Sequence, residues 1–168
     1  KDLYAANADG NYIGFMGATS WEGFYLQEAD GTVWHTAKSG STATPFFLTT
    51  DAAEGTWDLW FPGQSGCYYT NVNTTKKLWT ALWMPTLNVS GIDGGITMEY
   101  KRDKNQWQGI FTATGAGTIN IQMNGTGKLY DNTSVSGADN SIDDTKAKDT
   151  PFAFNGSANE LTFNTGTN

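Results

Sequence analysis

CYYTNVNTTKKLWTALW, residues 67–83, is the stretch that decides the fold, because it holds two alternating runs separated by a short polar turn. Alternation with a period of two is typical of β-strands. With residues 74–76 as a three-residue loop, Asn73 pairs with Lys77 and the side chains separate by character onto two faces. We therefore expect a β-hairpin at this position.

The two faces of the predicted hairpin differ in chemistry. One face is mostly apolar or β-branched and suits a core: Tyr68, Thr70, Val72, Leu78, Thr80 and Leu82. The other face carries three rings, two carboxamides and an ammonium: Tyr69, Asn71, Asn73, Lys77, Trp79 and Trp83. A sugar has an apolar C–H face and a hydroxyl edge, so flat rings bordered by hydrogen-bonding groups predict a carbohydrate site.

The opposite interpretation of the second face remains open. A second sheet that covered it would make Trp79 and Trp83 core residues, because tryptophan is highly buried on average. Against this, burial of Asn71, Asn73 and Lys77 without partners would be costly.

Strand patterns recur on both sides of this hairpin, and no window keeps apolar residues at helical spacing. They fall at residues 12–16, 24–28, 32–35, 46–50, 57–61, 96–100, 106–113, 152–154 and 161–163. We expect an all-β antiparallel sandwich, jelly-roll or immunoglobulin-like, with almost no helix. Residues 1–168 are predicted to form one domain, with a long polar loop around residues 131–150.

Further aromatic candidates lie outside the hairpin. Alternation over residues 57–61 directs Asp58 and Trp60 away from the core, so they form a second candidate binding patch. Trp21, in a glycine-rich loop, is a third candidate, unless its ring holds that loop onto the core. Trp107 is expected to be a core residue.

Composition and charge exclude several classes of partner. Aromatic residues make up 14% of the 168 residues and the net charge is -7. Nucleic acid and anionic membrane surfaces both require a basic stripe, which this chain lacks. No stretch of about 20 apolar residues is present, so we expect no membrane insertion.

The single cysteine, Cys67, excludes an intrachain disulfide, and we expect it to be buried.

Catalytic patterns are weak, and we expect no enzyme activity. The acidic residues show no pattern that marks a glycosidase acid and nucleophile, and His35 is the only histidine. No cofactor is predicted, although Asp139, Asp143 and Asp144 could hold a structural calcium ion, the alternative being a solvated acidic loop.

Two stretches resemble a known family. GITMEYKRDKNQWQGIFTATGAGTINIQMNG at residues 95–125 and YIGFMGATSWEGF at residues 12–24, roughly a quarter of the chain, are similar to domains of SusE/SusF-like surface lipoproteins of Bacteroidetes. The resemblance implies a non-catalytic β-sandwich that binds oligosaccharides on aromatic platforms. It also implies a cell-surface location, with a lipid anchor to the outer membrane in the full-length protein. The expected partners, besides the glycan, are neighbouring domains or a glycan-uptake complex.

The sequence thus favours a secreted or cell-surface module that binds a poly- or oligosaccharide without chemistry. Two alternatives remain open. A β-sandwich glycoside hydrolase or polysaccharide lyase would need a carboxylate pair, and an adhesin or assembly module would use its aromatic face to bind protein.

Overall fold

The computed structural model describes residues 3, 9–39, 41–90, 94–112, 115–142, 150–155 and 158–164, and gives the backbone alone for residues 55–57, 118–124, 142, 150–155 and 158–164. Within these ranges the chain forms β-strands and no helix, and every strand pair is antiparallel. The predicted all-β antiparallel sandwich is therefore confirmed. In this part of the chain there is no helix long and apolar enough to cross a membrane.

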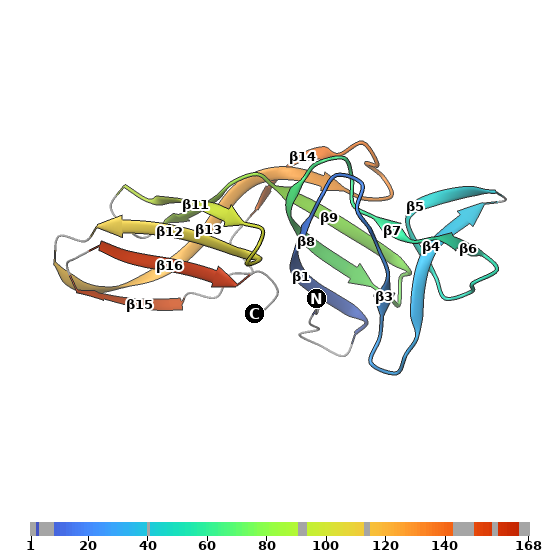
Figure 1. Cartoon of the computed structure of the whole chain (residues 1–168), viewed down its shortest axis with the longest axis horizontal. Helices are drawn as coiled ribbons and strands as arrows, with labels where there is room; N and C mark the ends of the chain where they lie inside the picture. The colour runs from blue at the N-terminus through green and yellow to red at the C-terminus, as the bar shows by residue number, and fades with distance from the viewer. Residues whose placement is uncertain are drawn as a thin grey trace.

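A central sheet lies in the middle of the molecule (Figure 1). Its strands are β1 (Asn11–Ala18), β8 (Gly66–Asn73), β9 (Leu78–Met84), the second half of β13 (Ala116–Tyr130) and β14 (Ala138–Ile142). They are hydrogen-bonded in the order β1-β8-β9-β13-β14. The hairpin predicted from residues 67–83 thus forms the β8–β9 pair of this sheet.

An N-terminal layer covers one face of the central sheet. It consists of β2 (Gly23–Phe24), β3 (Leu26–Gln27), β4 (Val33–Ser39), β5 (Thr42–Thr49), β6 (Gly55–Trp57) and β7 (Leu59–Trp60). Asp30 and Gly31 turn the chain between β3 and β4, and Gly31 has a positive φ of 92° that suits glycine.

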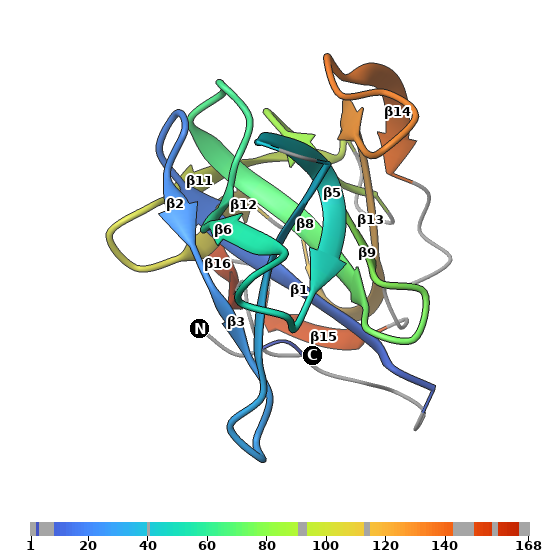
Figure 2. The ribbon, with the colours of Figure 1, turned by 90° about the vertical axis from the view of Figure 1, so that its right-hand side faces the viewer.

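A C-terminal layer covers the opposite face. It consists of β10 (Leu87–Ser90), β11 (Ile96–Lys101), β12 (Gln106–Thr112), β15 (Thr150–Asn155), β16 (Ala158–Asn164) and the first half of β13. Figure 2 views the stack end on, with the N-terminal layer in front, the central sheet behind it and the C-terminal layer at the back. The central sheet therefore has neighbours on both faces.

The first core fills the space between the central sheet and the N-terminal layer. Trp79 of β9 is 3% exposed, and its ring centroid lies 4.8 Å from that of Phe46 and 5.2 Å from that of Phe24. The other buried members are Ala18, Trp34, Leu48, Leu59, Phe61, Tyr68, Val72, Ala81 and Tyr130. Much of the aromatic excess of the sequence is used here, since aromatic pairs stabilise a core by about 0.5–1.5 kcal/mol beyond burial.

The second core lies on the other face of the same hairpin. Its buried members are Cys67, Met84, Leu87, Val89, Met98, Trp107 and Phe111. Tyr69 and Leu82, which alternate with the first-core residues along β8 and β9, pack against it. The predicted burial of Cys67 and Trp107 is confirmed, at 0% and 1% exposure.

The register of the hairpin differs from the prediction. Asn73 pairs with Leu78 and Val72 with Trp79, so the loop has four residues, 74–77, and not three. Lys77 takes a left-handed φ of 55°, and the Asn73 Oδ1 accepts a hydrogen bond from the backbone N–H of Lys76 at 2.7 Å. A shift of one residue exchanges the faces of one strand relative to the other.

Other expectations have mixed outcomes. Leu59 and Phe61 are buried as predicted, whereas the strand expected over residues 57–61 is interrupted at Asp58. The expected polar loop around residues 131–150 is wrong in part, because β14 occupies its middle and pairs with β13. Residues 143–149 lie outside the described residues.

Replacing the ring at the centre of the first core should be costly. We expect Trp79→Ala to lower the free energy of unfolding by about 3–5 kcal/mol, since it removes a large buried side chain and leaves a cavity. Urea unfolding measures the change. If the alanine variant does not fold, the milder Trp79→Phe variant is measured in its place. Ile110→Ala, at a position 71% exposed, is the control and should change stability by less than about 0.5 kcal/mol. Equal effects of the alanine substitutions would contradict the two-sided burial of the hairpin.

Candidate functional site

The aromatic platform predicted on the hairpin does not exist as one surface. Trp79 lies in the first core, while Tyr69 faces the second core and places its ring centroid 5.1 Å from that of Phe15. The prediction that both rings lie exposed on one face is wrong, because β8 and β9 are covered from both sides and the register puts these residues on opposite faces.

The polar residues of the predicted platform have structural surroundings. Asn71 and Asn73 are half-buried, on the same side of β8 as Tyr69, and Asn73 holds the 74–77 loop through its side chain. Lys77 is exposed, and its carbonyl accepts a hydrogen bond from the backbone N–H of Leu48 at 2.8 Å. The structure therefore does not bring Lys77 and the two asparagines into one patch with the tryptophans.

The second predicted patch is also divided. Asp58 is exposed and its carbonyl accepts from the Thr36 Oγ1 at 3.2 Å, whereas Trp60 is half-buried and lines a small internal space with Trp79 and Phe46. Trp60 thus points partly inward, and the pair offers no open aromatic surface.

Trp21 is the candidate that stays open to solvent. Its side chain is 66% exposed, more than any other described aromatic residue. The backbone at Trp21 has a left-handed φ of 59°, which is rare for a bulky residue and costs roughly 1–2 kcal/mol. Residues in such conformations cluster at functional sites.

A close contact with Gly63 sets the position of the Trp21 ring. A Cβ added at Gly63 would lie 3.1–3.2 Å from three atoms of the indole, so the ring rests directly on the glycine backbone. One side of the indole is thus supported by the 61–66 loop. Because the side chain is two-thirds exposed, the remaining surface of the ring is available to a flat ligand.

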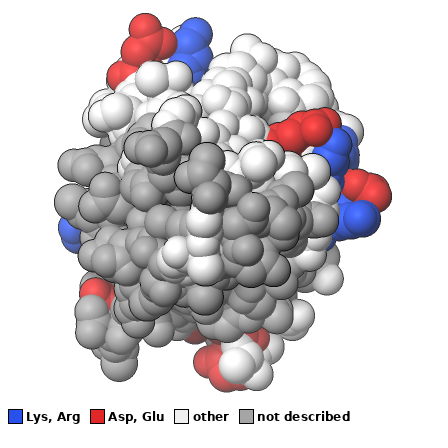
Figure 3. Space-filling view, turned by 90° about the vertical axis from the view of Figure 1, so that its left-hand side faces the viewer, with Lys and Arg blue, Asp and Glu red and all other residues white. Residues whose placement is uncertain are grey.

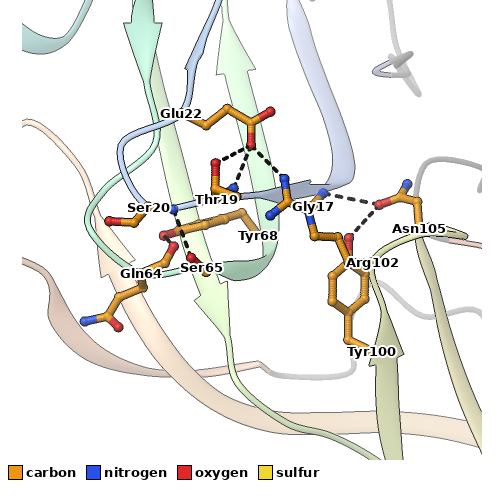
Figure 4. Close-up of polar contacts among 10 residues, drawn as sticks. All are labelled: Gly17, Thr19, Ser20, Glu22, Gln64, Ser65, Tyr68, Tyr100, Arg102 and Asn105. Atoms are coloured by element: carbon orange, nitrogen blue, oxygen red, sulfur yellow. Dashed lines mark hydrogen bonds and ion pairs between the residues drawn. The ribbon is translucent and has the colours of Figure 1, made fainter.

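Serine side chains join the Trp21 loop to the 61–66 loop (Figure 4). The backbone N–H of Ser20 donates to the Ser65 Oγ at 3.0 Å, and the Ser20 hydroxyl donates to the Gly63 carbonyl at 3.0 Å. The Tyr68 hydroxyl donates to the Gln64 carbonyl and lies 3.2 Å from the Pro62 carbonyl. The two loops therefore form one hydrogen-bonded unit around the tryptophan.

Glu22 anchors the other end of the Trp21 loop. Its carboxylate accepts from the backbone N–H of Thr19 at 2.6 Å and from the Thr19 hydroxyl at 3.0 Å. The same carboxylate pairs with the Arg102 guanidinium, in the β11–β12 turn, at 3.1 Å (Figure 4). Both partners are nearly half-exposed, so the ion pair contributes at most about 1 kcal/mol, and its main effect is to orient the loop.

A second tie to the β11–β12 turn passes through Asn105. Its Oδ1 accepts from the backbone N–H of Gly17 at 3.2 Å and from the Tyr100 hydroxyl at 2.9 Å. Burial raises the pKa of Tyr100 to about 12. Gly17 admits this hydroxyl only because it lacks a side chain: an added Cβ would lie 1.7 Å from the Tyr100 oxygen.

Trp83 lies on the other side of the 61–66 loop. The ring is half-buried, packs against the first core and donates from Nε1 to the Ser65 carbonyl at 3.2 Å. It also forms a wall of an open groove of about 570 Å³, whose other lining residues are Pro85, Thr126, Gly127, Lys128, Asp139, Asn140 and Ser141. Of the tryptophans predicted on the hairpin, Trp83 alone borders an open surface.

Several residues of this region were missed from the sequence. Gly63, Ser65 and Ser20 gave no pattern signal, because small polar residues fill every turn of this chain. The contribution of β14 was missed because its residues, alanine, aspartate, asparagine and serine, are typical of loops. Of the residues around the 61–66 loop, the sequence named the two tryptophans, Trp21 and Trp83, in advance.

The calcium prediction stays a prediction. Asp139 is exposed and lines the groove, whereas Asp143 and Asp144 lie outside the described residues. Among the side chains that the structure describes, no group of three histidine, cysteine or acidic residues is placed to hold a metal ion.

Fold and site together define an antiparallel β-sandwich protein whose edge carries a hydrogen-bonded, tryptophan-bearing loop. The model of the family described as "Domain of unknown function (DUF5111)" matches residues 1–84, half of the chain, and the chain belongs to this family. The matched region includes the Trp21 loop, the 61–66 loop and both strands of the central hairpin. No curated protein and no solved structure matches the chain.

The left-handed backbone at Trp21 determines how substitutions there change the stability of the protein. Glycine adopts this φ without the Cβ penalty that alanine keeps, so we expect Trp21→Gly to be more stable than Trp21→Ala by about 1 kcal/mol. Thermal unfolding of the two variants measures the difference. The reverse order would show that the backbone at this position is not left-handed.

The buried Tyr100 hydroxyl predicts a loss of stability in alkali. The pKa of this hydroxyl is 10.0 in the unfolded chain and about 12 in the folded protein. Its contribution to the free energy of unfolding is therefore complete below pH 10 and is lost as the pH rises to about 12. Burial also raises the pKa of Tyr68 and of Tyr69. Urea unfolding across this range should therefore show a flatter pH dependence in Tyr100→Phe than in wild type, and identical slopes would contradict the assignment.

Proposed function

We propose that this protein is a non-catalytic module that binds poly- or oligosaccharide, with the Trp21 indole as the ring on which a sugar stacks. The observation that carries the proposal is the combination at Trp21 of high exposure, a strained backbone and a supporting loop. The fold gains nothing evident from an exposed indole in a left-handed conformation, whereas a binding site requires a rigid, open ring.

The surroundings of the ring suit a sugar. Ser20, Gln64 and Ser65 belong to the two loops that meet at the indole, and hydroxyl and amide groups match the hydroxyls at the edge of a sugar ring. A preformed loop also lowers the entropy lost on binding. Affinity from one stacked ring would be weak, so several modules or sites would act together.

Charge supports a neutral carbohydrate over other partners. The net charge of -7 disfavours nucleic acid. Along the upper and right-hand rim of the face drawn in Figure 3, blue and red side chains lie next to one another, and the described residues of this view form no cluster of blue atoms. A secreted or cell-surface location, like that of the SusE/SusF-like lipoproteins that the sequence resembles, belongs to the same proposal.

Removal of the Trp21 ring tests the function. We expect wild-type protein to be retarded in gels containing its polysaccharide, and Trp21→Gly to lose about 1.5–3 kcal/mol of binding free energy, because the stacked ring is absent. That loss corresponds to roughly a 10- to 150-fold weaker affinity. A panel of plant, fungal and bacterial polysaccharides serves as the screen.

The matched control is Ile110→Gly, which removes an exposed apolar side chain from β12 in the C-terminal layer. It should leave retardation unchanged. Unchanged binding by Trp21→Gly would remove the site. Release of reducing ends or unsaturated products from a retained polysaccharide would favour the hydrolase or lyase alternative, and a protein complex insensitive to oligosaccharide would favour the adhesin alternative.

A further inference from the structure

The groove beside Trp83 is formed by one face of the central sheet. Trp83 is the register partner of Lys128, and Lys128 is the partner of Asp139, so the three side chains lie on the same face. Thr126 and Ser141, partners of each other, continue that face along β13 and β14. Elsewhere this face is covered by the N-terminal layer, but at β14 it remains open as the groove.

The groove and the Trp21 ring share one loop. Trp21 rests on Gly63, and the Trp83 Nε1 donates to the Ser65 carbonyl. Gly63 and Ser65 are two positions apart, so their backbones are separated by at most about 7 Å. Figures 1 and 2 both place the 18–22 loop, the 61–66 loop and β14 toward the upper side of the molecule. Both indoles therefore contact the same short loop, on the side of the molecule where β14 also lies.

The groove lining has a mixed, nearly neutral chemistry. On the face that carries Trp83 it offers two hydroxyls, from Thr126 and Ser141, one cation, Lys128, and one anion, Asp139. Near Trp21 the charged groups are also balanced, since Glu22 is paired with Arg102. A uronate or sulfated chain would meet no excess of positive charge at either end of this edge.

We propose that the groove is a second subsite of the same binding edge, so that an extended, neutral glycan lies across both indoles. The inference rests on the proposed function and goes beyond it by naming the ligand class. The groove is open and not an enclosed cavity, so it accommodates the middle of a chain and does not select a chain end. Lys128, Asp139 and the two hydroxyls bind the sugar hydroxyls there, while Trp83 supplies the apolar wall.

Blocking the groove tests the second subsite. Ser141 is exposed on β14, so Ser141→Phe fills the groove without changing the core, and Ser136→Phe in the preceding turn places the same side chain outside it. Titration calorimetry with linear gluco-, manno- and xylo-oligosaccharides, from disaccharide to hexasaccharide, gives affinity as a function of length. Thr126→Phe is a second blocking variant should Ser141→Phe disturb folding, which circular dichroism detects.

We expect wild-type affinity to rise with chain length, and Ser141→Phe to bind the longest ligand about tenfold more weakly while binding the shortest as wild type does. Ser136→Phe should match wild type at every length. Polygalacturonate should bind no more tightly than the neutral series.

Three results would overturn the inference while leaving Trp21 as a glycan site: affinity independent of length, equal behaviour of the two phenylalanine variants, or preference for polygalacturonate. Binding of no glycan at all would remove the proposed function and this inference together.

Discussion

The packing of Trp79 between the central sheet and the N-terminal layer is the interaction on which the rest of the structure depends. With Phe24, Phe46 and Phe61 around it, the indole joins β9 to strands that are distant in sequence. The opposite side of the same hairpin supports the second core through Cys67 and Met84. Because Trp79 packs on one face of the hairpin and Cys67 and Met84 on the other, the hairpin forms no open platform of three rings, and only Trp83 at its end borders an open surface.

Two-sided packing of the hairpin leaves the edge of the sandwich as the place of the proposed binding site. The loops that leave the layers there carry Trp21 and support Trp83, and the hydrogen bonds of Ser20, Ser65, Glu22 and Asn105 hold them in place. The site is thus built on loops, yet these loops are tied to all three layers. Such a scaffold orders the ring before a ligand arrives.

The sequence predicted most of the strands because alternation, turn residues and β-branched side chains agreed along the chain. It did not predict the hairpin register, since that argument assumed that one face was solvated and had to be polar. Because each face of the hairpin packs against another layer, a division into one polar and one apolar face does not determine the register. The loop also has four residues where three were expected, and it ends at Lys77, whose φ is left-handed. Asn71 and Asn73 were misleading because they lie at half-buried positions.

The candidate site was predictable only in part. Trp21 could be recognised because a tryptophan among glycines has no strand pattern to assign it to a core. The groove could not, since it depends on pairing between β9 and β13, residues 45 positions apart at Trp83 and Lys128. Contacts so distant in sequence leave no local pattern.

Hydroxyl-radical footprinting read by mass spectrometry tests the central claim most directly, since it reports the solvent exposure of each tryptophan in one experiment. The account predicts rapid oxidation of Trp21, slow oxidation of Trp79 and Trp107, and protection of Trp21 when a bound glycan is present. Oxidation of Trp79 as fast as that of Trp21 would contradict the account, because the Trp79 face of the hairpin would then be exposed to solvent and not packed in the first core.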